Sequence, residues 1–379
     1  MTTTEKRGPL QVARRTRLLE VLQRDGVLRI SDLTETLGAA AVTIRRDIAQ
    51  LAAAGLVRRV HGGVALPDGD DTAAVLDVAA VDDPLPRMPA ELSGRTLGML
   101  VPSLDYYWPH VAQGAEEAAR ELGMRVVLRG SSYESEDDRP QLQRMVERLG
   151  VDALIVTPRI DAPTSERTFA WLSGIGLPVV LLERTAAVGP HREVLESVVT
   201  DHALGAAMAV RHLASLGHRK VGVVLAKPSP TGPHVHRGWL EATAECGLDS
   251  TGTVDARVPD APSPECVAAL DDVLDQCLAT GTTALLVHAD AEAITLIQRC
   301  EERHLSVPGG LSIVAYDDEV AGLFSPPLTA VRPPRRSIGR AAVRLVADRL
   351  SDPERPTHRM VISPSLRVRG STAEPHGNR

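Results

Sequence analysis

Two groups of residues in this chain could do chemistry, and the first is a set of arginines near the N-terminus. Arg45 and Arg46 are adjacent in one segment, and Arg58 and Arg59 are adjacent in the next. A guanidinium can contact phosphate oxygens or bridge the O6 and N7 atoms of guanine in a major groove. The arginines therefore indicate contact with double-stranded DNA. The candidate DNA-binding residues are Thr43, Arg45, Arg46, Gln50, Arg58, Arg59 and His61.

The second group is an aromatic cluster. Tyr106, Tyr107 and Trp108 are consecutive, although the chain has only 4 Tyr, 3 Trp and 2 Phe. A sugar needs a flat apolar surface for its C–H face and hydrogen-bonding partners for its hydroxyls. The cluster follows the first strand expected in the larger part of the chain, where open α/β sheets bind ligands. It predicts a sugar-type site, with packing of a lobe or subunit interface as the alternative.

Charge is distributed unevenly along the 379 residues. Residues 1–66 carry 11 Lys and Arg against 6 Asp and Glu, a net charge of +5, whereas residues 67–94 and the remainder each carry −6. A basic head on an acidic body is typical of a protein that contacts a polyanion at one end, because the local field governs the contact.

Three short helices and a hairpin are expected to position the arginines. Helices are predicted at 14–24, 31–38 and 42–55, the last with apolar residues spaced by four and three and with its arginines on the outer face. Residues 56–66 alternate apolar and basic side chains around a Gly-Gly turn, which predicts a two-stranded wing. Two short helices joined by a tight turn are the layout that places a recognition helix in a major groove.

This head resembles the winged helix-turn-helix of DeoR-family regulators. The hallmark of that family appears here as Thr43-Ile44-Arg45-Arg46-Asp47-Ile48, Gly55-Leu56 and Arg59-Val60-His61-Gly62-Gly63. The family usually has Val-Ser where this chain has Ala39-Ala40, and loss of a serine helix cap costs about 1 kcal/mol. The alternative is a small helical interaction module with incidental arginines.

An acidic segment separates the head from a larger body. Residues 67–94 are rich in Asp and Pro and lack an amphipathic period, which indicates a linker. From residue 95 onward, apolar strands alternate with amphipathic helices at the rhythm of βαβ units in a parallel sheet. The expected strands are 96–101, 125–128, 153–157, 179–182, 220–225, 283–287 and 312–316.

The body resembles the effector-binding core shared by LacI-family regulators and periplasmic sugar-binding proteins. The matching landmarks are Leu97-Gly98-Met99-Leu100-Val101-Pro102, Gly114-Ala115-Glu116, Val198-Val199-Thr200-Asp201, Leu216-Gly217-His218-Arg219-Lys220-Val221, Arg237-Gly238-Trp239, Ala315-Tyr316-Asp317-Asp318 and Pro326-Pro327-Leu328-Thr329-Ala330-Val331. The resemblances imply an α/β protein with a small winged helix-turn-helix domain (1–66) and a two-lobed, doubly wound, periplasmic-binding-like domain (95–370). Lobe 1 is expected at 95–198 and 320–350, lobe 2 at 199–319 and 357–370, and a tail at 371–379.

The same resemblance implies further ligand contacts. Arg184 follows a strand where the family usually has Asp-Arg, Arg237 precedes a Gly-aromatic pair, and Asp290 opens a helix. The alternatives are lobe-closing salt bridges for the arginines and a helix N-cap for Asp290. Asp317 and Asp318 are expected to act as a hinge or structural pair. The candidate effector-binding residues are Tyr106, Tyr107, Trp108, Arg184, Arg237 and Asp290.

Composition and motifs disfavour other classes of protein. No apolar run approaches the roughly 18 residues of a membrane span, and the polar, basic N-terminus lacks a secretory core, so we expect a cytoplasmic protein. The four cysteines lack metal or disulfide spacing, and His234 and His236 form a pair without further ligands. No GxGxxG, P-loop or GxSxG motif is present. We expect no metal, no cofactor and no enzymatic activity.

Together these features predict a transcriptional repressor that binds operator DNA as a homodimer or dimer of dimers and responds to a small sugar-like effector. The wing and the acidic linker take the place of the minor-groove hinge helix of LacI-type regulators, so contacts by the major-groove helix and the wing alone are expected. The alternatives are a sugar-binding protein without a regulatory role and a sugar-active enzyme.

Overall fold

The computed structural model describes residues 92–104, 106–132, 135–249 and 252–375, together with single residues and short strands between 18 and 65. The chain divides into two units, 1–85 and 86–379, and each is described by itself.

The head contains a small antiparallel sheet beside buried helical residues. Its strands, in the order β1-β3-β2, are β1 (Leu28–Arg29), β2 (Arg58–Val60) and β3 (Gly63–Ala65). The expected hairpin is confirmed by β2 and β3, and β1 adds a third strand that the sequence pattern did not indicate. The buried helical residues are Leu18, Val21, Leu33, Ile44 and Ile48.

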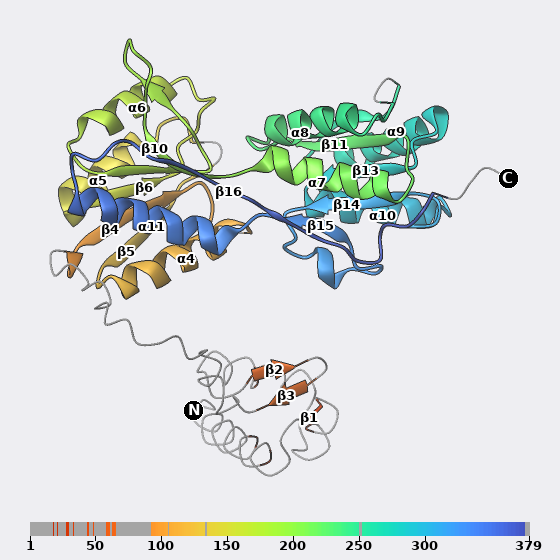
Figure 1. The fold of residues 1–379 in the computed structure, drawn as a ribbon, viewed down its shortest axis with the longest axis horizontal. Helices are drawn as coiled ribbons and strands as arrows, with labels where there is room; N and C mark the ends of the chain where they lie inside the picture. Colours follow the sequence, from red (N-terminus) through yellow and green to blue (C-terminus); the bar gives the residue numbers. More distant parts are fainter. Residues whose placement is uncertain are drawn as a thin grey trace, which may run out of the picture. The chain divides into compact units, whose positions relative to one another are not determined.

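Lobe 1 is a six-stranded parallel sheet in the order β16-β10-β7-β6-β4-β5, with helices on both faces (Figure 1). The side chains of β4 alternate, so that Leu97 and Met99 pack with α4 and α11 on one face while Leu100 packs with α5 and α6 on the other. Its elements are β4 (Thr96–Val101), α4 (Trp108–Glu121), β5 (Arg125–Gly130), α5 (Arg139–Leu149), β6 (Ala153–Val156), α6 (Ser165–Gly174), β7 (Val179–Leu182), β10 (Glu196–Thr200), α11 (Arg335–Ser351) and β16 (Arg359–Ile362), with a separate hairpin of β8 (Ala187–Val188) and β9 (Glu193–Val194).

Lobe 2 repeats this architecture in the strand order β12-β11-β13-β14-β15-β17, in which only β17 is antiparallel to its neighbour. Helices α7 and α8 cover one face and α9 and α10 cover the other. Its elements are α7 (His202–Ser215), β11 (Val221–Lys227), α8 (Gly232–Glu245), β12 (Asp255–Pro259), α9 (Pro264–Thr280), β13 (Ala284–His288), α10 (Asp290–Glu302), β14 (Ser312–Tyr316), the short helix η2 (Ala321–Leu323), β15 (Thr329–Arg332) and β17 (Ser365–Arg367).

The chain passes between the lobes at residues 200–202, 332–335 and 362–365. The expected lobe boundaries differ from this at two places. The segment 320–332 was assigned to lobe 1, but β15 pairs with β14 in lobe 2. The segment 357–362 was assigned to lobe 2, but β16 pairs with β10 in lobe 1. Backbone pairing decides both positions, because β15 and β16 are strands of only four residues next to chain crossings.

Helices α4 and α11 approach each other closely through glycine. A Cβ atom on Gly114 would lie 2.1 Å from the carbonyl oxygen of Arg336, and one on Gly339 would lie 2.0 Å from that of Val111. Their contact forms much of the lobe 1 core beside the sheet. Within the described parts of the chain, no helix combines the length and apolar character needed to cross a bilayer.

Candidate ligand-binding cleft

A cavity of about 430 Å³ opens between the lobes, at the carboxyl ends of the strands of both sheets. This size falls within the roughly 300–1,000 Å³ of small-molecule sites. Lobe 1 contributes the loops after β4 and β7, and lobe 2 contributes the loops after β11, β12, β13 and β14. The lining residues with polar or aromatic side chains are Ser103, Tyr106, Tyr107, Trp108, Glu183, Arg184, His202, Ser229, Thr231, Asp260, His288, Glu292 and Asp317.

The aromatic cluster lines this cavity, but its three members differ in exposure. Tyr106 is 49% exposed. Trp108 is only 3% exposed and belongs to the lobe 1 core, and Tyr107 meets it edge to face with ring centroids 5.2 Å apart. Tyr107 also donates a hydrogen bond from its hydroxyl to Glu183. Tyr106 is therefore the ring most available to a ligand, and Tyr107 and Trp108 support its loop.

A hydrogen-bonded network joins the two lobes at the back of the cavity. Glu183 accepts hydrogen bonds from the Thr200 backbone N–H at 2.9 Å and the Thr200 hydroxyl at 2.7 Å, and its Oε2 lies 3.3 Å from His202 Nε2. The other ring nitrogen of His202 lies 3.0 Å from the hydroxyl of Tyr316, at the end of β14. Burial would raise the pKa of Glu183, but His202, Thr200 and Tyr107 outweigh it and lower the pKa to about 2.

Two further side chains in the cavity have shifted pKa values. Burial lowers the pKa of His288 to about 4, helped by nearby His202, so the His288 imidazole is neutral near pH 7. Its Nδ1 is buried and has no hydrogen-bond partner among the described residues. Burial raises the pKa of Asp317 to about 6, and Glu292 and Glu183 add to the rise against the opposing effect of His202 and Arg335.

The other predicted effector contacts are placed differently. Arg184 lines the cavity and donates from Nη1 to the Glu183 carbonyl oxygen at 2.7 Å. Arg237 lines an adjoining cavity of about 290 Å³, which shares Arg184, Glu183 and His202 with the first. The Arg237 side chain is 60% exposed, and its Nε lies 3.9 Å from Glu241.

Asp290 does not line the cavity. Its carboxylate is fully buried and accepts backbone N–H groups from Asp318, Glu319, Val320 and Ala321 at 3.2, 2.7, 2.9 and 3.1 Å. Asp290 therefore fixes the loop after β14 instead of facing a ligand. The alternative role as a helix N-cap is not seen either, because Asp290 is the first helical residue of α10 and Ala289 precedes it as the N-cap.

Sequence reasoning placed Asp317 and Asp318 together in a structural role, and the structure separates them. Asp318 is buried and pairs with Arg332 at 2.6 Å and Arg369 at 2.8 Å, as a structural residue would. Asp317 lines the cavity. His202, His288 and Glu292 were not singled out, although His288 ends a strand and so meets the rule that ligands bind at the carboxyl ends of strands.

Only two of the seven predicted DNA contacts lie among the residues that the structure describes. Arg58 and Arg59 lie in β2 of the wing. The remaining predicted contacts, Thr43, Arg45, Arg46, Gln50 and His61, lie outside the described residues.

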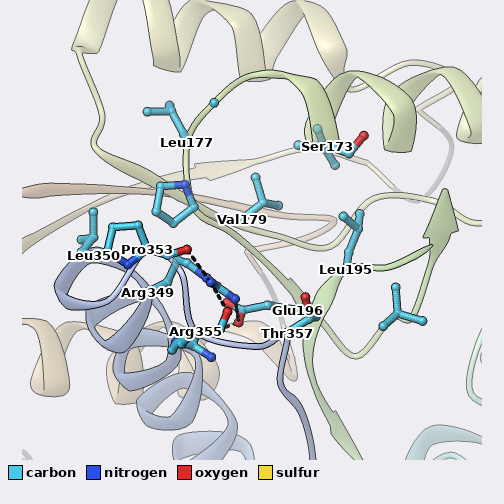
Figure 2. A pocket seen from close by; sticks show the side chains of 14 residues that line it. Ser173, Leu177, Val179, Leu195, Glu196, Arg349, Leu350, Pro353, Arg355 and Thr357 are labelled. Carbon is cyan, nitrogen blue, oxygen red and sulfur yellow. Dashed lines mark hydrogen bonds and ion pairs between the residues drawn. The ribbon is translucent and has the colours of Figure 1, made fainter. Parts of the chain in front are cut away.

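A larger cavity, of about 540 Å³, lies on lobe 1 near the amino ends of β7 and β10 (Figure 2). Its charged groups pair with one another: Glu196 accepts a hydrogen bond from Arg349 at 2.9 Å and forms an ion pair with Arg355 at 2.8 Å. Both arginines also donate to carbonyl groups of the loop after α11 or of α11 itself. These contacts hold that loop in place and leave the interlobe cavity as the better candidate site.

Comparison with known proteins identifies both parts of the chain. A model of the DeoR-like helix-turn-helix domain matches residues 14–69, and one of the periplasmic binding protein-like domain matches residues 210–372. An uncharacterized HTH-type transcriptional regulator in the aml 5′ region of Streptomyces limosus is 30% identical over 79% of this chain and 85% of its own length. The HTH-type transcriptional regulator reg1 of Streptomyces lividans is 27% identical over 93% of this chain and 98% of its own.

A solved structure gives the same result for the body. A LacI family transcriptional regulator from Mycobacterium smegmatis is 25% identical, with a TM-score of 0.59 over 74% of this chain and 100% of that one. The fold and these relatives define a DNA-binding transcriptional regulator with a periplasmic-binding-like core. The chain belongs to the LacI family of HTH-type transcriptional regulators, and its helix-turn-helix is of the DeoR type. The family and fold class expected from the sequence are confirmed.

Proposed function

We propose that this regulator is a repressor whose affinity for operator DNA is set by a small sugar-like effector bound between the lobes. The interlobe cavity carries the proposal, because it is lined from both lobes and combines the exposed Tyr106 ring with several polar groups. A ligand that contacts both lobes stabilises one lobe arrangement and so shifts an equilibrium by its differential affinity. Effector contacts are assigned to Tyr106 and Arg184, with Arg237 reached through the adjoining cavity, while Tyr107 and Trp108 line the cavity wall and support the loop of Tyr106.

Residues 1–66 are proposed as the DNA-binding domain, acting in the cytoplasm as a homodimer or a dimer of dimers. The heads of a dimer would occupy half-sites about 34 Å apart or a multiple of that. The assigned DNA contacts are Thr43, Arg45, Arg46, Gln50, Arg58, Arg59 and His61. Recognition by the third helix and the wing, without a minor-groove hinge helix, agrees with the seven acidic residues among positions 67–94.

Footprinting of the DNA upstream of the gene that encodes this protein tests the DNA-binding head. Arg45→Ala and Arg46→Ala are each expected to abolish the specific footprint, because a bidentate arginine–guanine contact contributes about 1–3 kcal/mol of discrimination. Arg120→Ala, an exposed arginine of the body, is the matched control and should leave the footprint intact. Unchanged footprints from both head variants would refute the assignment.

A thermal-shift screen against sugars tests the cavity. Ligand at 100 times its dissociation constant adds about 2.7 kcal/mol to the stability of the domain that binds it. A sugar that stabilises the wild type should stabilise Tyr106→Ala less, and it should change operator affinity in a gel-shift assay. A sugar that binds without changing operator affinity would favour a binding protein with no regulatory role.

A further inference from the structure

The interlobe cavity is lined mainly by acidic side chains, and this charge affects which sugars it can bind. The inference rests on the proposed function of that cavity as the effector site. Four carboxylates line it, from Glu183, Asp260, Glu292 and Asp317, against the guanidinium of Arg184 and the imidazole of His202, which lies 3.3 Å from Glu183. The neutral His288 adds no positive charge near pH 7, because its pKa is about 4.

Two of the four carboxylates are already satisfied by the protein. Glu183 accepts from Thr200 and Tyr107 and faces His202. Glu292 accepts the backbone N–H groups of Ala261 at 3.0 Å and Ala289 at 2.8 Å. These two groups shape the cavity and have little capacity left for a ligand.

Asp317 is in a different state. Among the described residues, no donor makes a hydrogen bond to its carboxylate oxygens, although its backbone N–H and carbonyl are both engaged. The nearby guanidinium of Arg335 is committed to Glu319 at 2.9 Å and to the Asp317 carbonyl. A partly buried carboxylate without a donor is costly, and a ligand that supplies one removes that cost.

The surroundings of Asp317 favour a cationic donor. Tyr106 lines the same cavity as Asp317. Burial, and after it the negative charges of Asp290, Asp317, Glu292 and Glu319, raises the pKa of the Tyr106 hydroxyl well above the ordinary value. An aromatic face beside carboxylates is the arrangement that binds ammonium groups. His288 is 7% exposed, and its Nδ1 has no partner in the described part of the chain, so it adds a neutral hydrogen-bonding group of the kind that suits a hydroxyl.

We propose that the cavity selects a polyhydroxylated effector carrying a basic amine, in the simplest case an amino sugar, with its ammonium group at Asp317 beside Tyr106. The hydroxyls of this effector meet Ser103, Thr231 and His288. A phosphorylated or carboxylated sugar is rejected, because its charge would be repelled by the same carboxylates.

Titration calorimetry of the full-length protein tests this selection with three sugar series. Glucose, galactose and mannose are each used as the neutral sugar, the 2-amino-2-deoxy sugar and the 6-phosphate, at low salt. In at least one series the amine should bind at least about tenfold more tightly than the neutral sugar, with the phosphate weakest. N-acetylation of that amine removes the charge and should remove the gain.

Two variants test whether the carboxylate of Asp317 is the group that binds the ammonium. Asp317→Asn should weaken binding of the amine about tenfold and change binding of its neutral parent by less than about threefold. Asp272→Asn, at an exposed position of α9 outside the cavity, is the control and should change neither. Neutral sugars or phosphates that bind as tightly as the amine, with Tyr106→Ala weakening them, would overturn this inference and leave the proposed function standing. If no member of any series binds, both proposals fail.

Discussion

At the scale of single residues, Asp290 illustrates how much one carboxylate can hold. It is fully buried, and four consecutive backbone N–H groups donate to it. Removing the acceptor leaves buried donors unsatisfied, at about 1–3 kcal/mol each before relaxation. Asp290→Ala should therefore lower the free energy of unfolding of the body by roughly 3 kcal/mol, and Asp290→Asn should lower it less because an amide oxygen remains.

Urea unfolding followed by tryptophan fluorescence measures this effect. All three tryptophans, at positions 108, 171 and 239, lie in the body, so the signal does not report on the head. Asp272→Ala, at an exposed position of a neighbouring helix, is the control and should stay within about 0.5 kcal/mol of the wild type. An equal loss in both variants would show that the loop after β14 does not depend on Asp290.

Asp317 gives a pH-dependent prediction at the same scale. Its folded-state pKa, about 6, exceeds the ordinary value of 3.8, so its stabilising contribution is complete below pH 3.8 and is lost as the pH rises through 6. Asp317→Asn mimics the protonated form, so it should gain stability relative to the wild type as the pH rises from 4 to 7. The expected gain is roughly 2 kcal/mol, which is less than the full shift because the side chain is partly exposed. The same fluorescence measurement at several pH values gives this difference, and a flat difference would contradict it.

At the scale of elements, the contact between α4 and α11 depends on glycine. A Cβ atom on Gly339 would lie 2.0 Å from the Val111 carbonyl oxygen, so Gly339→Ala must push the helices apart. Overpacking of this kind costs about 1–3 kcal/mol, and the tryptophan-detected stability should fall by that amount. Gly174→Ala is the matched control on α6, where nothing lies within 4 Å, and it should be neutral or stabilise by up to about 1 kcal/mol.

The elements also show what the sequence could predict. Strands β4, β7 and β14 lie at the expected residues, because each is a continuous apolar run buried on both faces. Strand β16 was missed because it is an edge strand and most of its residues are exposed. The lobe boundaries depend on crossings of only a few residues, which have no compositional signature.

The candidate site was predictable in part, because its residues follow strands that the sequence predicts. Position after a strand drew attention to Tyr106 and Arg184, and both line the interlobe cavity. The same rule could not tell that Asp290 turns inward to bind backbone N–H groups while Asp317 faces the cavity. That difference depends on the conformation of the loop after β14, where Asp317 has a φ of +93° and Asp318 one of +53°. Such backbone geometry has no counterpart in hydrophobic periodicity.

At the scale of the whole body, an ion pair between Arg335 and Glu319 bridges the lobes. Arg335 begins α11 in lobe 1 and Glu319 follows β14 in lobe 2, with the charged atoms 2.9 Å apart and both side chains about 10% exposed or less. The Arg335 guanidinium also lies 5.9 Å from the centroid of the Tyr107 ring. Because these contacts cross between lobes next to one of the three chain crossings, they should hold the lobes in the arrangement seen here.

Arg335→Ala removes this bridge and leaves Glu319, among the described residues, with only the more distant His110 Nε2 at 3.7 Å as an ionic partner, so the lobes should separate more readily. Hydrogen exchange measures this, and it should accelerate in peptides that cover the other two crossings, at 200–202 and 362–365. Arg336→Ala is the control, because Arg336 is adjacent and exposed and its side chain contacts Glu117 and Gln113, which both lie within lobe 1. Faster exchange confined to α11 in both variants would show that the substitutions only loosen the start of this helix, and that the Arg335–Glu319 ion pair does not hold the lobes together. Faster exchange at the distant crossings in Arg335→Ala alone would show that this ion pair stabilises the lobe arrangement. An effector bound in the cavity would then either add to that stabilisation or oppose it.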